Sequence, residues 1–154
     1  MVGSNGPHCR QLGHRARARI SAGHPRFAAA PVQVQQVTQQ FIRACSDGDL
    51  AGLLSLFAAD ITLASDGGGK VSAARNVIIG GERVARFLVG IMRKAAAPLS
   101  FQTAHVNGQL GILVWRAGQL NRIYSLDVDA SARIRAIYCV LNPDKLHSWR
   151  ASDP

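Results

Sequence analysis

The first of two short segments that could do chemistry combines an acid, three glycines and a lysine: Asp66-Gly67-Gly68-Gly69-Lys70. Successive glycines permit positive φ and let another group approach the backbone closely. Their N–H groups could cradle an anion, Lys70 would add a point charge, and Asp66 could accept from backbone donors. The spacing is not the GxxxxGK[ST] of a P-loop. From the residues alone, a mobile glycine-rich hairpin is the simpler interpretation.

The second segment, Asn142-Pro143-Asp144-Lys145-Leu146, lies near the end of the chain. Asn142 can hold a turn, Pro143 suits the first turn of a helix, and Asp144 favours a helix N-terminus. Two interpretations stay open. The segment is either a simple helix start after the last strand or a docking segment against the glycine segment, with Asp144 or Lys145 pairing across it.

Three titratable side chains are candidates for general acid–base chemistry, namely Asp66, His105 and Asp127. A general base needs a perturbed pKa and reach to a substrate. The simpler interpretation is a strand histidine for His105 and a strand-end turn residue for Asp127. The sequence has no paired carboxylates, no Ser/His/Asp order and no metal-ligand spacing. We therefore predict no catalytic residue, no metal and no cofactor.

Five aromatic residues could line a pocket for a small apolar ligand, although core packing is the simpler interpretation for most of them. They are Phe87, Phe101, Trp115, Tyr124 and Tyr138.

The formal net charge of +9 is unevenly distributed. Residues 1–27 contain five arginines and no acid, so the remaining residues are only mildly basic. Clustered arginines give salt-dependent affinity for phosphates, and four of them carry a weak nucleic-acid-binding prediction. These are Arg10, Arg15, Arg17 and Arg19. For the chain in isolation, a solvated tail is the simpler interpretation.

Length and composition indicate one folded domain in the cytoplasm. The chain has 154 residues, of which 47% are hydrophobic and 18% charged. No apolar run approaches the roughly 20 residues of a membrane span, and no secretory h-region is present. The three cysteines, Cys9, Cys45 and Cys139, are widely spaced and fit reduced, mostly buried thiols.

Hydrophobic periodicity predicts three helices. The first begins near Pro31, stops at Asp47-Gly48, and is followed by Asp49 as the N-cap of the second. The third follows Gly80-Gly81 and is closed by Pro98. The stripe of the first helix is Val34, Val37, Phe41 and Cys45. The second buries Leu50, Leu53, Leu54 and Phe57, and the third Val84, Phe87, Leu88, Ile91 and Met92.

From Leu99 onward the hydrophobic period changes to two, which predicts strands. A short strand at 61–63 precedes them. The later strands are expected at 99–106, 110–116, 120–128 and 133–141. Their connections are short, so neighbouring strands should be antiparallel. The fold class is therefore α+β, with helices on one face of a curved meander of about four strands.

These motifs together resemble a known family. The glycine segment, residues 81–88, Val106-Asn107-Gly108 and the 142–146 segment are similar to the SnoaL-like C-terminal extension of extracytoplasmic-function (ECF) RNA polymerase sigma factors. The resemblance covers about residues 33–147. It implies the nuclear-transport-factor-two-like cone, also described as SnoaL-like or cystatin-like, in which a curved antiparallel sheet packs on about three helices and leaves a pocket.

The resemblance also implies a domain organisation. Residues 1–31 look like a basic arm and linker, a remnant of the promoter-reading helix of sigma region 4. Residues 32–147 would form the SnoaL-like domain, and residues 148–154 a tail.

The function that the resemblance implies is regulation of transcription initiation. Asp66 to Lys70 and Asn142 to Leu146 would contact sigma core domains or RNA polymerase. Promoter DNA is expected as a partner only together with sigma regions that these residues do not contain. No membrane partner is expected, and a homodimer is a further candidate assembly. The alternatives are a standalone ligand-binding protein, an isomerase, cyclase or hydrolase of the same fold, or a remnant that merely folds.

Overall fold

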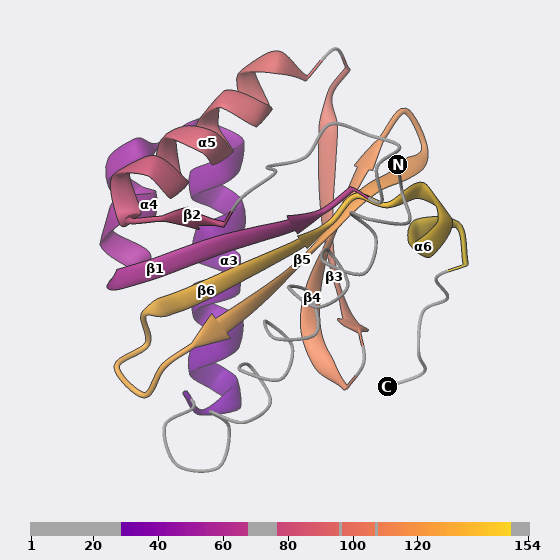
Figure 1. Cartoon of the computed structure of the whole chain (residues 1–154). Coiled ribbons are helices and arrows are strands. Elements are labelled where there is room, and N and C mark those ends of the chain that lie inside the picture. The colour runs from indigo at the N-terminus through magenta and orange to yellow at the C-terminus, as the bar shows by residue number, and fades with distance from the viewer. Residues whose placement is uncertain (1–28, 68–76, 96, 107, 149–154) are drawn as a thin grey trace.

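The computed structural model describes residues 29–67, 77–95, 97–106 and 108–148 (Figure 1). The first half contains α3 (Pro31–Asp47), α4 (Leu50–Leu56), β1 (Phe57–Asp66), β2 (Ile78–Ile79) and α5 (Gly81–Lys94). The second half contains β3 (Leu99–Val106), β4 (Gln109–Arg116), β5 (Gln119–Val128), β6 (Ile134–Val140) and α6 (Pro143–Ser148). None of the helices in these ranges is long and apolar enough to cross a membrane.

The strands form one six-stranded sheet in the order β2-β1-β6-β5-β4-β3. Strands β3 to β6 pair antiparallel with their neighbours, as a meander requires. Strand β1 pairs parallel with β6, although about 70 residues separate them. Figure 1 shows α3 crossing behind the sheet, with α4 and α5 near one end of β1. The predicted α+β class with a curved sheet is confirmed, but the sheet has six strands and α6 packs on the face opposite α3 and α5.

Local sequence determines where the helices begin and end. Pro31 occupies the first turn of α3, and Gly48 ends it with a φ of 64°, a conformation that favours glycine. Asp49 caps α4, because its Oδ1 accepts from the N–H of Gly52 at 2.9 Å. The starts predicted for both helices are therefore confirmed.

Several predicted details of the helices and first strand are wrong. Leu54 is 39% exposed, and Phe57 begins β1 instead of ending α4. Strand β1 has ten residues because it finds a long parallel partner in β6, which local periodicity cannot reveal. Helix α5 ends at Lys94, before Pro98 is reached.

The two faces of the sheet carry separate hydrophobic clusters. The inner face packs against α3 and α5, and Tyr124 meets Phe41 of α3 edge to face with ring centroids 5.9 Å apart. The outer face carries a smaller cluster into which α6 inserts Leu146. The buried members of this outer cluster are Leu113, Ile123, Tyr138, Val140 and Leu146.

Candidate functional site

The end of β1 and the start of α6 meet in what we call the junction, residues 66–67 together with 141–146. Asp66, the last residue of β1, accepts two backbone hydrogen bonds on its carbonyl oxygen. Leu141 N–H donates at 2.7 Å and Asn142 N–H at 2.9 Å. The parallel pairing of β1 with β6 continues into these bonds, with Asp66 opposite Val140. The main chain therefore fixes the glycine segment's first residues beside the 142–146 segment.

A side-chain ion pair also closes the junction. Lys145 Nζ lies 2.5 Å from Asp66 Oδ2, across 79 residues of sequence. The Asp66 side chain is only 6% exposed, whereas that of Lys145 is 44% exposed. A carboxylate withdrawn from water requires charge or hydrogen-bond partners, and Lys145 supplies one from the solvent side.

Helix α6 is positioned by its own first turn and by one apolar anchor. Asn142 Oδ1 accepts from the N–H of Asp144 at 3.1 Å, and Asn142 carbonyl oxygen accepts from the N–H of Leu146 at 3.0 Å. Leu146 is buried in the outer cluster. The exposed side chains of Pro143, Asp144 and Lys145 lie on this turn. The predicted helix start is thus present, and the segment also contacts Asp66.

Only some of the predicted regulatory residues lie within the described ranges. Asp66 and Gly67 are buried, and Asn142 to Leu146 lie in the junction. Gly68, Gly69 and Lys70 lie outside the described residues, as do Arg10, Arg15, Arg17 and Arg19. The regulatory role of all these residues stays a prediction.

Asp127 is held by a cation on the outer face of the sheet. Arg135 donates from Nε at 3.1 Å and from its terminal nitrogen at 2.9 Å to Asp127 Oδ2. A register shift between β5 and β6 at this point places Arg135 beside the carboxylate. The Asp127 carboxylate is therefore held in an ion pair within the β5–β6 hairpin.

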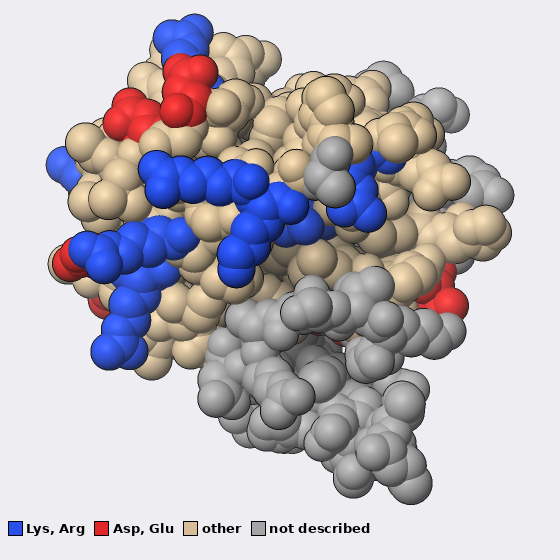
Figure 2. All heavy atoms as spheres, turned by 90° about the horizontal axis from the view of Figure 1, so that it is seen from above, with Lys and Arg blue, Asp and Glu red and all other residues tan. Residues whose placement is uncertain are grey.

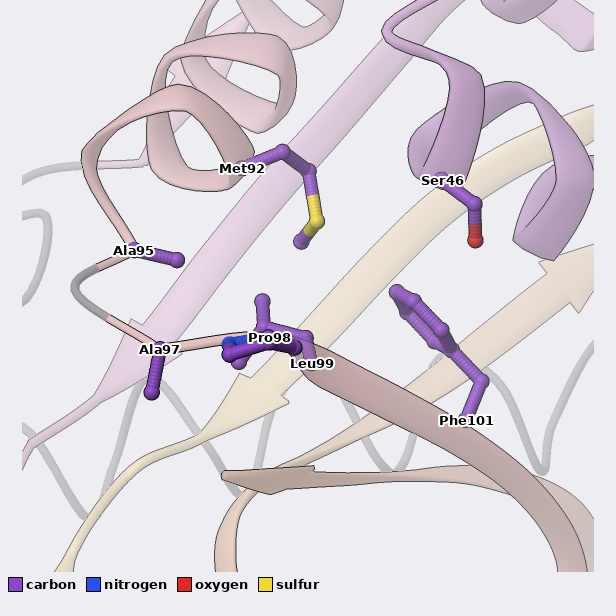
Figure 3. Close-up of a pocket in the computed structure, with 7 residues that line it drawn as sticks. All are labelled: Ser46, Met92, Ala95, Ala97, Pro98, Leu99 and Phe101. Atoms are coloured by element: carbon purple, nitrogen blue, oxygen red, sulfur yellow. The ribbon is translucent and has the colours of Figure 1, made fainter. Parts of the chain in front are cut away.

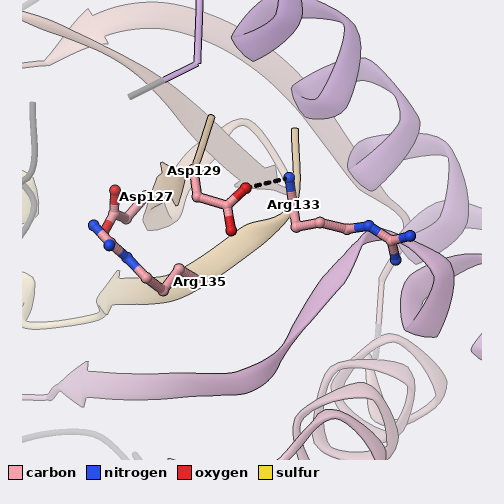
Figure 4. Close-up of polar contacts among 4 residues, drawn as sticks. All are labelled: Asp127, Asp129, Arg133 and Arg135. Carbon is pink, nitrogen blue, oxygen red and sulfur yellow. Dashed lines mark hydrogen bonds and ion pairs between the residues drawn. The ribbon is translucent and has the colours of Figure 1, made fainter. Parts of the chain in front are cut away.

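The turn next to this pair is also built on a carboxylate (Figure 4). Asp129 Oδ1 accepts from the N–H groups of Ser131 and Arg133 at 2.9 and 3.1 Å. The Arg133 side chain donates to the carbonyl of Ser55 at 2.9 Å and ties the turn to α4. Asp129, Arg133 and Arg135 therefore make structural contacts that no local sequence pattern indicates.

A cavity of about 320 Å³ opens between the ends of α3 and α5 and the start of β3 (Figure 3). Its lining is Ser46, Met92, Ala95, Ala97, Pro98, Leu99 and Phe101. The lining contains no acid and no histidine, and His105 is an exposed residue further along β3. Of the five aromatic candidates, Phe101 lines this cavity, whereas Tyr124 and Phe87 pack in the inner core. Trp115 and Tyr138 belong to the outer cluster.

Two buried thiols belong to the inner core. Cys45 and Cys139 are unpaired cysteines, and burial raises the pKa of each to about 12. The same burial raises the pKa of Tyr124. Within the described ranges, no group of three or more His, Cys, Asp or Glu residues is placed to hold a metal ion. Cys9 lies outside the described residues.

Basic side chains gather on the face of the molecule seen from above (Figure 2). Helix α5 contributes exposed cations on one side, at positions 83, 86, 93 and 94. Glu82 pairs with Arg86 at 2.6 Å, but both side chains are about two-thirds exposed, so this pair contributes little stability.

The architecture places this protein among the SnoaL-like and cystatin-like α+β folds. A crystal structure of a SnoaL-like protein from Burkholderia thailandensis superposes with a TM-score of 0.55, at 17% identity over 73% of this chain and 96% of that one. This likeness concerns the fold. No family model matches the sequence.

Sequence comparison identifies the more specific relatives. The chain is homologous to ECF RNA polymerase sigma factors: it is 32% identical to the probable ECF sigma factor SigI of Mycobacterium tuberculosis, over 97% of its own length. The crystal structure of the ECF sigma factor SigJ from that organism superposes with a TM-score of 0.64, at 28% identity over 93% of this chain and 51% of that chain. The chain spans about half the length of these relatives.

Proposed function

We propose that this chain is the SnoaL-like regulatory part of a sigma-factor-like transcription regulator and that it acts by contacting sigma segments or RNA polymerase. The junction carries the proposal, because it joins the start of the glycine segment to the 142–146 segment, two of the motifs that carry the family resemblance. Homology to ECF sigma factors over 97% of the chain supports the same role in transcription. Promoter DNA enters only through sigma regions outside these residues, and action on the polymerase would take place in the cytoplasm.

The first turn of α6 has the properties of a protein contact. Its backbone is fixed by Asn142 and its position by the buried Leu146, so exposed side chains are presented at low entropic cost. Asp144 and Lys145 offer opposite charges on this turn. Such charges favour specificity and encounter rate more than raw affinity.

An enzymatic role has less support. The cavity beside Phe101 is lined by no acid and no histidine, and Asp127 is paired with Arg135. Neither predicted base candidate on a strand therefore reaches this cavity.

The test is binding of the full 154-residue chain to core RNA polymerase of Mycobacterium tuberculosis, alone and as the SigJ holoenzyme. We expect micromolar binding to at least one of them. Asp144→Ala and Lys145→Ala should each weaken that binding by five-fold or more. The matched controls are Asp60→Ala and Lys94→Ala, at exposed positions outside the junction, and both variants should bind like the wild type.

Thermal unfolding of each variant separates lost contacts from lost folding. Absence of wild-type binding to both forms of the polymerase contradicts the proposal. Equal binding by the junction variants and their controls would show that the junction does not contact the polymerase.

A further inference from the structure

We infer that the inner face of the sheet, beside the cavity, holds a binding site for a small aryl carboxylate, with Arg122 as its counter-charge. This inference goes beyond the proposed function and depends only on the geometry of the cone. Arg122, on β5, donates from Nε to Asn121 Oδ1 at 2.8 Å and from one terminal nitrogen to Tyr124 Oη at 3.4 Å. A guanidinium has five N–H donors, so three remain for another acceptor.

Arg122 has no carboxylate partner among the described residues. The ion pairs there join Arg86 to Glu82, Arg135 to Asp127 and Lys145 to Asp66. Eight of the nine acids of the sequence lie in the described ranges, and the ninth is Asp153. Arg122 is half-buried, and a cation withdrawn from water is usually paired with an anion. The unmatched charge therefore favours an anion brought from outside.

The strand register places Arg122 at the cavity's end of the inner face. Arg122 pairs with Val114 on β4, and Val114 pairs with Phe101 on β3. Phe101 lines the cavity (Figure 3). Two strand spacings of about 4.8 Å put the Arg122 and Phe101 backbones roughly 10 Å apart, and both side chains lie on the inner face. An aromatic body can thus pack against Phe101, Leu99 and Met92 while its carboxylate reaches Arg122.

A second polar group, the Ser65 hydroxyl, lies on the same inner face, in the line of cross-strand neighbours that passes through Tyr124. Ser65 Oγ is buried and is the only such side-chain atom in the described ranges without a hydrogen-bond partner. Ser65 pairs with Cys139, which pairs with Tyr124, the residue that Arg122 contacts. An unsatisfied buried hydroxyl costs about 1–3 kcal/mol, and a ligand oxygen or water could satisfy it.

Ser65 also lies next to the junction. It directly precedes Asp66, and successive side chains of a strand point to opposite faces, so Ser65 lies on the inner face behind the carboxylate that Lys145 pairs with on the outer face.

The carboxylate matches the planar fork of the guanidinium, which binds it through two parallel hydrogen bonds. The probes are 2-naphthoate and 2-naphthamide, which share one shape and differ in charge. Isothermal titration calorimetry of the full chain should give at least tenfold tighter binding of 2-naphthoate. Equal affinities, or no binding of either probe at millimolar concentration, would overturn the inference.

Variants test the position of the site. Arg122→Gln should abolish the preference for 2-naphthoate, Arg122→Lys should keep part of it, and the exposed control Arg116→Gln should keep it fully. Met92→Trp fills the cavity and should weaken the binding of both probes equally. An unchanged preference in Arg122→Gln, or unchanged binding in Met92→Trp, places the probe elsewhere and refutes the site. Because no polymerase takes part, failure here is distinguishable from failure of the proposed function.

Discussion

The two faces of the sheet use different interactions. The inner face is a continuous apolar core under α3 and α5, with two protonated thiols and a buried tyrosine. The outer face is covered in part by the six-residue α6 and contains two buried carboxylates, Asp66 and Asp127, each paired with a cation. Apolar burial drives folding, whereas an ion pair chiefly fixes which segments lie together. The inner face therefore stabilises the domain, and the outer face specifies the junction.

The two outer ion pairs differ in what they connect. Arg135 and Asp127 are eight residues apart within one hairpin, whereas Lys145 and Asp66 are 79 residues apart. The first pair holds a local turn, and the second joins the end of β1 to α6. Only the second can couple the glycine segment to the C-terminal helix.

Alkaline pH should have the largest effect, and it should act on the inner face. The thiols of Cys45 and Cys139 have pKa values raised from 9.0 to about 12. Between those values the unfolded chain loses protons that the folded chain keeps, so stability is intact below pH 9 and falls as pH rises toward 12. At pH 11, two units above the ordinary value of 9.0, the loss is on the order of 3 kcal/mol for each thiol. Urea denaturation at pH 8 and pH 11 measures the loss.

The control is the Cys45→Ala, Cys139→Ala double variant. It should lose less stability between the two pH values than the wild type does. Equal losses would mean that the thiols do not carry the alkaline sensitivity of the inner face.

Truncation of a side chain in the inner core should have the second-largest effect on stability. Phe41 is fully buried and packs edge to face on Tyr124. Phe41→Ala should lower the free energy of unfolding by about 3–5 kcal/mol, because it leaves a cavity as well as losing apolar burial. Urea denaturation at pH 7 checks this, and Val32→Ala, at an exposed position on the same helix, should change stability by less than about 0.5 kcal/mol.

Arg135→Met tests the local ion pair of the outer face. It leaves the Asp127 side chain, 8% exposed, without its cation and should cost about 3 kcal/mol. Arg116→Met, at an exposed position of β4, is the matched control and should be nearly neutral. A cost below 1 kcal/mol for Arg135→Met would show that water reaches Asp127.

Lys145→Met tests the long-range pair and should cost less, about 1–2 kcal/mol, because solvent already screens the half-exposed lysine. Its effect should be local. Hydrogen exchange of the Leu141 and Asn142 amides, which donate to Asp66, should accelerate more than exchange in β4. Uniform acceleration throughout the sheet would contradict a specific role at the junction.

The smallest effect lies outside both faces, in the β4–β5 turn. Ala117 and Gly118 have φ values of 52° and 78°, as in the two-residue turns that favour asparagine followed by glycine. Ala117→Asn should raise the free energy of unfolding by about 0.5–1 kcal/mol, since alanine is strained at positive φ. Ala130 lies in the β5–β6 turn and is not among the positive-φ residues, so Ala130→Asn should give no such gain in thermal unfolding.

Local patterns were sufficient for most elements. The helical spacing of Val37, Phe41 and Cys45 predicted α3, and alternation predicted β3 to β6 within one or two residues. Caps such as Asp49 and Gly48 act over a few residues, so the sequence displays them directly. The same locality explains the errors at Leu54 and Phe57, where contact with distant elements decides burial.

The two segments of the candidate site could be recognised in the sequence, but the contacts that bring them together could not. Docking of the 142–146 segment against the glycine segment, with Asp144 or Lys145 pairing across it, was one of two open interpretations, and the structure pairs Lys145 with Asp66. The Asp127–Arg135 pair escaped notice because it arises from a register shift between β5 and β6. Arg122 gave no signal, since an arginine in an alternating strand resembles any solvent-facing cation.

The sequence by itself determined the helices, the four-strand meander, the turn chemistry and the family likeness, all of which depend on neighbours within a few positions. Only the tertiary structure decided that β1 runs parallel to β6, and with it the junction. The packing of β3 to β5 against the helices likewise decided that Arg122 lies near the cavity. Pairing between distant strands depends on how well whole faces bury one another, a free energy summed over the fold and not encoded in any short stretch of residues.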